Sequence, residues 1–150
     1  WEDVKHLKYD ILLIFGGGFA LAHGFEKSGL IIYLVQQLTF VQHISVFWML
    51  LFISLTVTVI SEFASNIASV QLALPIIAAL SKHFPQEMSL KLLFSCVLSA
   101  SVGFILPVAT APNTIAFGTG RIPLSNMYKA GFWLDLFSIF TISIYCYCFL

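Results

Sequence analysis

The chain has 150 residues, of which 59% are hydrophobic and 9% are charged, and its mean hydropathy is +0.96. Soluble domains carry about a quarter charged residues, so this composition excludes an ordinary soluble fold and predicts an integral membrane protein whose main partner is the lipid bilayer. Seven basic residues balance seven acidic ones, which leaves no positive excess for nucleic-acid binding.

The first third of the chain predicts one membrane crossing and one surface helix. Residues 1–9 are polar and precede an apolar run, so we predict a loop over residues 1–9 and a transmembrane helix over residues 10–24. Residues 25–43 mix charged, amide and apolar side chains at helical spacing, which favours an interfacial helix. The chain starts at Trp1 without a signal peptide, so we expect it to be part of a longer protein.

Residues 44–82 predict a re-entrant hairpin. The sequence is apolar to Ile60, becomes polar in SEFASNIAS at residues 61–69, and is apolar again to about Leu80. The second apolar part has about a dozen residues, or roughly 18 Å of helix, against a hydrocarbon core of about 30 Å. It is too short to cross alone, so we expect a helix, a polar tip and a returning short helix.

Residues 89–118 predict a broken transmembrane helix. The apolar run is interrupted by LPVATAPNT at residues 106–114, in which Pro107 and Pro112 lack backbone donors. A loop then leads to a final transmembrane helix over residues 127–150. The fold class we predict is therefore all-α.

The two interruptions together indicate a binding cavity. Non-helical backbone at membrane depth occurs only where protein buries it or where it lines a watered cavity. The free carbonyl groups at such breaks suit a hard cation such as sodium, and the helix N-termini suit a carboxylate or another oxyanion. The candidate groups are Ser61, the Ala64 carbonyl, Ser65, Asn66, Ala109, Thr110 and Asn113. A simple capping role for Ser65 or Asn66 stays open.

Two carboxylates fall inside the predicted crossings. Glu62 lies in the centre of the hairpin and is either functional or a structural anchor, and the lack of a nearby intramembrane Lys or Arg favours the anchor. Asp135 falls early in the last crossing, where we expect a membrane interface. The three cysteines lie in apolar stretches and are given no role.

Four motifs resemble the divalent anion/sodium symporters, the group of sodium-dicarboxylate, citrate and sulfate cotransporters. They are ILLIFGGGFALAHGFEKSGL at 11–30, SEFASNIA at 61–68, LPVATAPNTIAFG at 106–118 and NMYKAGFWLDL at 126–136. The resemblance implies that the chain is the second of two inverted repeats, the C-terminal half of a secondary active transporter. It also implies sodium-coupled symport of a divalent anion, such as a C4-dicarboxylate, by an elevator-like homodimer in the plasma membrane, or the inner membrane if the source is bacterial.

The resemblance also assigns the site. Sodium, the coupling ion, would be bound by Ser61, the Ala64 carbonyl, Asn66 and the Ala109 carbonyl. The substrate would contact Ser65, Asn66, Ile67 and Thr110. Two positions depart from the family pattern, because Ile67 replaces the usual Thr and Ala111 replaces one of two prolines.

Two alternatives belong to other classes of activity. An exchanger of the anion against protons or another anion would need a titrating carboxylate, for which Glu62 is the candidate. An intramembrane enzyme would need a nucleophile or metal motif, and the sequence has no HExxH, GxGD or GxSG. We therefore do not expect an enzyme.

Overall fold

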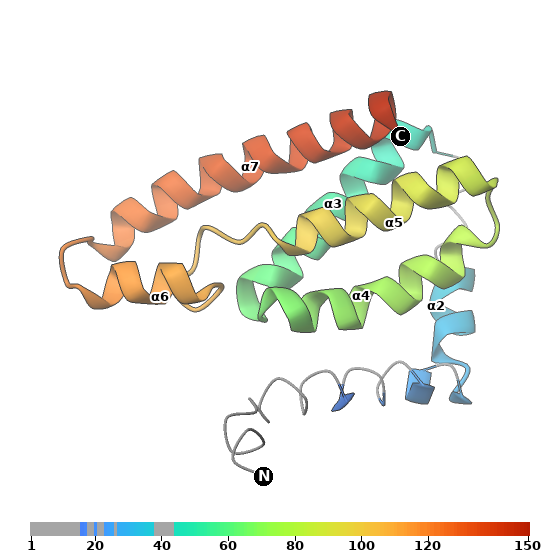
Figure 1. The fold of residues 1–150 in the computed structure, drawn as a ribbon, viewed down its shortest axis with the longest axis horizontal. Coiled ribbons are helices and arrows are strands. Elements are labelled where there is room, and N and C mark those ends of the chain that lie inside the picture. Colours follow the sequence, from blue (N-terminus) through green and yellow to red (C-terminus); the bar gives the residue numbers. More distant parts are fainter. Residues whose placement is uncertain (1–15, 18–19, 21–22, 26, 38–43) are drawn as a thin grey trace, which may run out of the picture.

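The computed structural model describes residues 16–17, 20, 23–25, 27–37 and 44–150 (Figure 1). All regular structure in these ranges is α-helical, which confirms the predicted all-α class. The helices are α2 (Leu30–Gln37), α3 (Val46–Phe63), α4 (Asn66–Ser81), α5 (Gln86–Ala100), α6 (Ala111–Gly118) and α7 (Leu124–Phe149). The predicted loop over residues 1–9 and most of the predicted helix over residues 10–24 lie outside the described residues.

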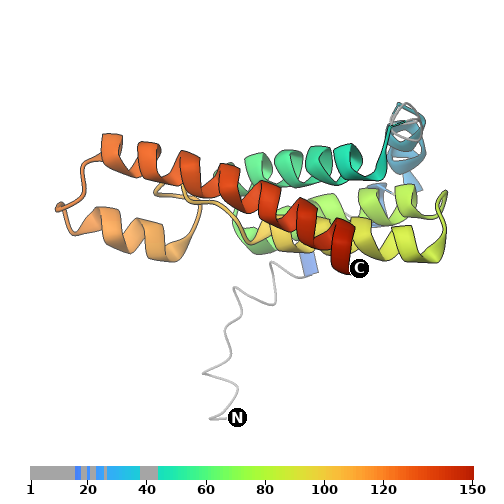
Figure 2. The same cartoon turned by 90° about the horizontal axis from the view of Figure 1, so that it is seen from above.

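Helices α3 and α4 form a pair whose junction lies near the middle of the structure (Figure 1). Both helices run from this junction toward the same end of the molecule. Helix α5 returns from that end, the chain is non-helical over residues 101–110, and α6 continues toward the opposite end. Figure 2 shows α7 running beside this interrupted path. The two interruptions therefore meet in the interior of the fold.

The break between α3 and α4 is confined to two extended residues. Ala64 has φ −125° and ψ 156°, and Ser65 has φ −61° and ψ 150°. The Ser65 side chain accepts a hydrogen bond from the backbone N–H of Ala68 at 3.3 Å, so Ser65 is the N-cap of α4, as its residue type favours.

Hydroxyl side chains on one face of α3 hold this helix against α5. The Ser54 and Ser95 hydroxyl groups lie 2.8 Å apart, Thr58 donates to the Ser99 carbonyl at 3.4 Å, and Ser61 donates to the Ala100 carbonyl at 2.8 Å. Small residues let membrane helices approach closely, and hydroxyl groups supply hydrogen bonds between them. This face therefore fixes the hairpin on α5.

A hydrophobic cluster fills the space between α3, α4, α5 and the end of α7. Its buried members are Met49, Leu50, Ile53, Val57, Ala73, Ile77, Leu92, Cys96, Ala100 and Cys146. None of the residues of α6 is buried in the described structure. The packed core therefore supports the hairpin and α5, and α6 projects beyond it (Figure 1).

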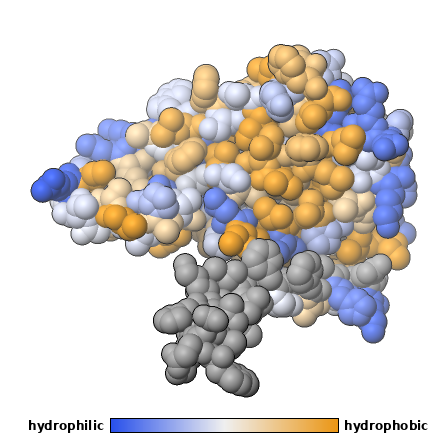
Figure 3. Space-filling model, viewed as in Figure 1, coloured by the Kyte–Doolittle hydropathy of each residue, from blue (hydrophilic) through white to orange (hydrophobic). Residues whose placement is uncertain are grey.

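The surface has the distribution expected of a membrane protein. Figure 3 shows hydrophobic residues over much of the middle of this face and hydrophilic residues at its two ends. Helices α3 and α7 are, within the described ranges, the two that are long and apolar enough to cross a membrane. These features agree with an α-helical membrane protein.

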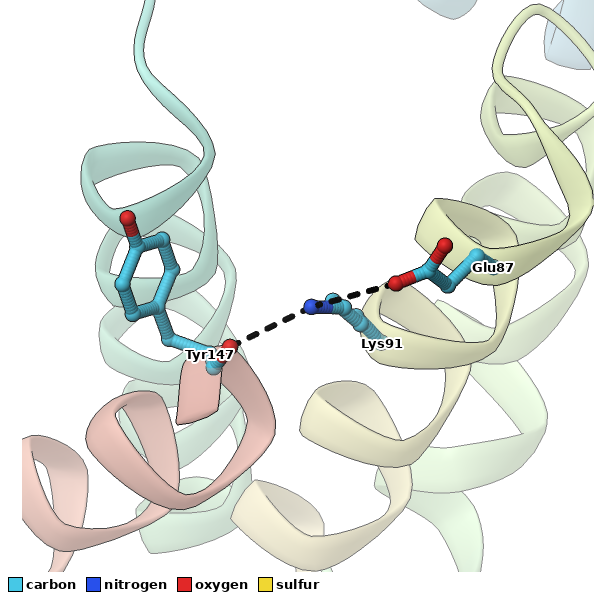
Figure 4. Close-up of polar contacts among 3 residues, drawn as sticks. All are labelled: Glu87, Lys91 and Tyr147. Carbon is cyan, nitrogen blue, oxygen red and sulfur yellow. Dashed lines mark hydrogen bonds and ion pairs between the residues drawn. The ribbon is translucent and has the colours of Figure 1, made fainter. Parts of the chain in front are cut away.

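Lys91 links the start of α5 to the end of α7 (Figure 4). Its ammonium group donates to the Tyr147 carbonyl at 3.2 Å and lies 3.9 Å from the carboxylate of Glu87. A cation near a helix C-terminus is favourable because the last carbonyl groups carry a partial negative charge. The contact lies at the opposite end of α7 from its connection to α6.

Candidate functional site

The tip of the hairpin brings together two of the predicted sodium ligands. Ser61 is fully buried, and its hydroxyl group lies 3.0 Å from the Asn66 side-chain oxygen and 2.8 Å from the Ala100 carbonyl oxygen. Asn66 is the first residue of α4, on the far side of the break. The extended residues Ala64 and Ser65 thus fold the chain so that both oxygens face the same point.

The second interruption ends in a capped helix. Thr110 is the N-cap of α6 and accepts a hydrogen bond from the backbone N–H of Asn113 at 3.3 Å. The Asn113 amide donates to the carbonyl groups of Gly103 and Leu106 at 2.9 and 3.1 Å. Pro112 fits the first turn because no intrahelical acceptor exists there. Asn113 therefore folds residues 103–106 back onto the start of α6.

Gly103, in the second interruption, lies next to the end of α3. A Cβ atom at this position would lie 3.4 Å from the Cβ atom of Ala109 and 3.5 Å from both the hydroxyl and the carbonyl oxygen of Ser61. Ser61 and Ala109 therefore flank the same point, although they are far apart in the sequence. The structure therefore brings together two residues predicted to bind sodium, with Ala109 contributing its side chain to this contact.

The carbonyl oxygens of Ala64 and Ala109 accept no hydrogen bond from any described residue. Neighbouring carbonyl groups do have donors, including those of Ala100, Gly103 and Leu106. A hydroxyl group, an amide oxygen and two unpaired carbonyl oxygens are hard, neutral ligands, which suit an alkali cation better than a transition metal. The described residues contain no cluster of three or more His, Cys, Asp or Glu side chains suited to a metal ion.

The predicted site residues differ in exposure. Ser65 and Ile67, predicted to contact the substrate, are exposed, and Ser61 and Ala109, predicted to bind sodium, are buried. Ala64, Asn66 and Thr110 are half-buried. Ser65 and Thr110 are the N-caps of α4 and α6, so two of the predicted substrate residues lie at helix N-termini. Helix N-termini attract anions through their free N–H groups.

Glu62 anchors the unwound backbone. Its two carboxylate oxygens accept the backbone N–H groups of Ile105 and Leu106 at 3.0 and 2.7 Å. The structural-anchor alternative from the sequence is therefore confirmed, because both oxygens are engaged and the side chain is 5% exposed.

The prediction that Asp135 lies near a membrane interface stays a prediction, and the structure shows that this residue is buried within the protein. Asp135 is 4% exposed, and its Oδ1 atom accepts the backbone N–H of Phe104 at 3.1 Å. Helix α7 begins at Leu124, so Asp135 lies well within this helix. An unwound segment with free N–H groups is the partner that draws a carboxylate inside.

Gly131 is a contact residue that sequence reasoning missed. The backbone of Phe104 and Ile105 passes so close that a Cβ atom at residue 131 would overlap it. Gly131 and Asp135 are four residues apart and hence share one face of α7. In the sequence, the only indication of this contact was the position of Gly131 one helical turn before the carboxylate of Asp135.

These features define a class of protein, an α-helical membrane protein with an oxygen-lined site between two interrupted helices, as in secondary transporters. A model of the sodium:sulfate symporter transmembrane region matches residues 1–149. The chain belongs to this symporter family, as its motifs indicated.

Two relatives are similar over nearly the whole chain. The sodium-dependent dicarboxylate transporter of Staphylococcus saprophyticus is 39% identical over 147 residues, which are 98% of this chain and 28% of that protein. Solute carrier family 13 member 2 of Mus musculus is 40% identical over 145 residues, which are 96% of this chain and 25% of that protein. The chain spans about a quarter of the length of these relatives.

Proposed function

We propose that the chain is part of a sodium-coupled symporter for a divalent anion, and that a C4-dicarboxylate is its substrate. The observation that carries this proposal is the junction of the two interruptions, where the Ser61 hydroxyl lies 3.0 Å from the Asn66 side-chain oxygen and Ser61 and Ala109 both border Gly103. The carbonyl oxygens of Ala64 and Ala109 accept no hydrogen bond from a described residue. Similarity to a sodium-dependent dicarboxylate transporter supports both the ion and the substrate class.

The two ligands would bind side by side. Sodium takes the oxygens of Ser61, Ala64, Asn66 and Ala109, and the anion takes the helix caps Ser65 and Thr110, with Asn66 shared by the two sites. Bound sodium places a positive charge next to the anion, which strengthens anion binding. Inward movement of sodium supplies about 2.3 kcal/mol per charge for each 100 mV of membrane potential.

The hairpin and the broken helix would move as one body. The hydroxyl contacts of α3 with α5 and the bonds from Glu62 to residues 105 and 106 must all break before the two elements can separate. Such rigidity supports an elevator-like movement of the whole site across the membrane. The proposal also includes a re-entrant placement of α3 and α4, a first inverted repeat elsewhere in the protein to which this chain is the second, a homodimer and a plasma-membrane location.

Uptake into proteoliposomes tests the proposal. Purified full-length protein is given labelled succinate, citrate or sulfate under a sodium gradient or an equal potassium gradient. We expect sodium-dependent succinate uptake that unlabelled dicarboxylates inhibit. Equal uptake in sodium and potassium would refute sodium coupling, and sodium-dependent uptake of sulfate alone would refute the substrate class.

An exchanger predicts a different result in the same vesicles. Exchange would require an anion inside the vesicles or a pH difference across their membrane. Symport proceeds into vesicles that contain no anion substrate and have the same pH on both sides. Glu62→Gln is unsuited to this comparison because Glu62 also anchors backbone N–H groups. Variation of the internal solution separates the two mechanisms without a mutation.

A further inference from the structure

The side chain of Asn113 binds two carbonyl groups of the non-helical segment that precedes α6. Its amide group donates to the Gly103 carbonyl at 2.9 Å and to the Leu106 carbonyl at 3.1 Å. Both acceptors are oxygens, so the amide presents its nitrogen to them, and the two N–H donors of one Asn side chain serve two different carbonyl groups. Asn113 therefore acts toward this segment as a double donor.

The backbone N–H of Asn113 is also diverted from the carbonyl group of Ala109. In a continuing helix that carbonyl would accept the N–H group four residues on, which belongs to Asn113. This N–H instead binds the Thr110 hydroxyl at 3.3 Å. The residue three positions on is Pro112, which has no N–H. The local backbone therefore leaves the Ala109 carbonyl without a donor, as the structure shows for the described residues.

Asn113 connects α6 to the part of the segment that touches the hairpin. Leu106 is held at both of its backbone groups, because its N–H donates to Glu62 Oε2 at 2.7 Å and its carbonyl accepts from Asn113. Gly103, also bound by Asn113, lies beside Ser61, whose hydroxyl oxygen is 3.5 Å from a Cβ atom built at residue 103. None of the residues of α6 is buried in the described structure, so side-chain hydrogen bonds take the place of apolar packing here.

We propose that Asn113 is a positioning residue of the sodium site. Its side-chain donors hold Gly103 against Ser61 and fix Leu106, whose carbonyl also accepts the backbone N–H of Ala109 at 3.2 Å. The Ala109 carbonyl oxygen thereby stays free and keeps its place next to the hairpin. This role rests on the proposed function, because it takes the ion to bind at the junction of the two interruptions. Asn113 itself does not bind the ion.

Two substitutions distinguish this role from direct binding of the ion by the Asn113 side-chain oxygen. Asn113→Asp keeps an oxygen at the same place, adds a negative charge and removes both side-chain donors. A direct ligand would then bind sodium at least as tightly, whereas a positioning residue would lose its bonds and repel the carbonyl oxygens of Gly103 and Leu106. Asn113→Ala removes the donors without adding charge, and gives the answer if the Asp variant does not fold.

Thr114→Val is the matched control. The Thr114 hydroxyl donates to the Pro107 carbonyl at 2.7 Å and to the Thr110 carbonyl at 3.2 Å. It is the next residue of α6 and binds the same segment, but neither acceptor is a proposed sodium ligand. The substitution therefore loosens α6 without removing a bond to Gly103 or Leu106.

Thermal unfolding in detergent measures sodium binding without transport. The melting temperature of purified full-length protein is followed as sodium chloride replaces potassium chloride at constant ionic strength, with no substrate present. Sodium bound to the folded protein raises the melting temperature. We expect the sodium concentration for half of this rise to increase about tenfold or more in Asn113→Asp and Asn113→Ala, and to stay within about twofold of wild type in Thr114→Val. A merely structural role would lower the melting temperature in potassium and leave that concentration unchanged.

Sodium activation of succinate uptake in proteoliposomes should shift in parallel. At saturating sodium the two Asn113 variants should return to at least about half of the wild-type rate, because the affinity for the ion is changed and not a later step. Unchanged sodium dependence in both variants, tighter sodium binding in Asn113→Asp, or an equal shift in Thr114→Val would overturn this role and leave the proposed function standing. A wild-type protein that sodium stabilises no more than potassium would instead refute the proposed function, and this role with it.

Discussion

Replacing Gly131 by Ala should damage the fold and the sodium site together. A Cβ atom there would overlap the carbonyl group of Phe104 and lie 2.6 Å from the Cα atom of Ile105, whereas ordinary contact begins at 3.4 Å. Helix α7 or the unwound segment must therefore move by more than about 0.8 Å, because the Phe104 carbonyl group lies closer still. The obstructing atoms are backbone, so no side-chain rotation relieves the overlap.

The magnitude follows from two opposing effects. Overpacking costs about 1–3 kcal/mol, and overlap with backbone places this substitution near the upper end. Ala is favoured over Gly in a helix by about 1 kcal/mol, which leaves a net destabilisation of about 2 kcal/mol. The displaced residues carry the N–H groups that bind Asp135 and Glu62, so the sodium concentration for half-maximal uptake should rise about tenfold.

Two measurements on purified full-length protein check this prediction, thermal unfolding in detergent and sodium activation of succinate uptake. Gly118→Ala is the matched control, because Gly118 is also helical and nothing lies within 4 Å of its added methyl group. Gly118→Ala should leave both measurements at wild-type values or slightly raise stability. If Gly131→Ala behaves in the same way, the close approach of α7 to residues 104 and 105 is wrong.

Three further substitutions probe the site itself. Asn66→Ala removes an oxygen beside Ser61 and should abolish sodium-dependent uptake in vesicles. The exposed control Asn126→Ala should retain uptake, and equal activity of the two variants would contradict the assignment. Asn113→Ala loses the hydrogen bonds to the Gly103 and Leu106 carbonyl groups and should lower the free energy of unfolding by about 1–3 kcal/mol. Thermal unfolding measures this change, and an unchanged melting temperature would show that these bonds do not hold residues 103–106 in place. Ile67→Thr restores a hydroxyl group at the start of α4, at a residue that is 43% exposed. It should raise the apparent affinity for succinate, about tenfold for each net 1.4 kcal/mol of binding free energy gained. Uptake titrations that are unchanged for succinate and sulfate would place residue 67 outside the substrate site.

The sequence alone determined the class of fold and the approximate location of its interruptions. Hydropathy reports whether a segment prefers lipid, and this preference needs no knowledge of neighbours. The polar residues 61–69 interrupt an apolar run, and the helices of the structure end and restart within them, at Phe63 and Asn66. At the second interruption, predicted at residues 106–114, α6 begins at Ala111, but α5 already ends at Ala100, six residues before the predicted segment. The capping role of Ser65 was also accessible, because N-cap preference is a local property.

Only the tertiary structure decided which distant groups meet. Nothing in the sequence states that the N–H groups of residues 104–106 lack helical partners and turn toward α3 and α7, where Glu62 and Asp135 accept them. The close approach at Gly131 and the shared neighbourhood of Ser61 and Ala109 around Gly103 likewise depend on how the helices pack. Local preferences fix where a helix stops, but the partners of the backbone groups it leaves free are set by three-dimensional packing.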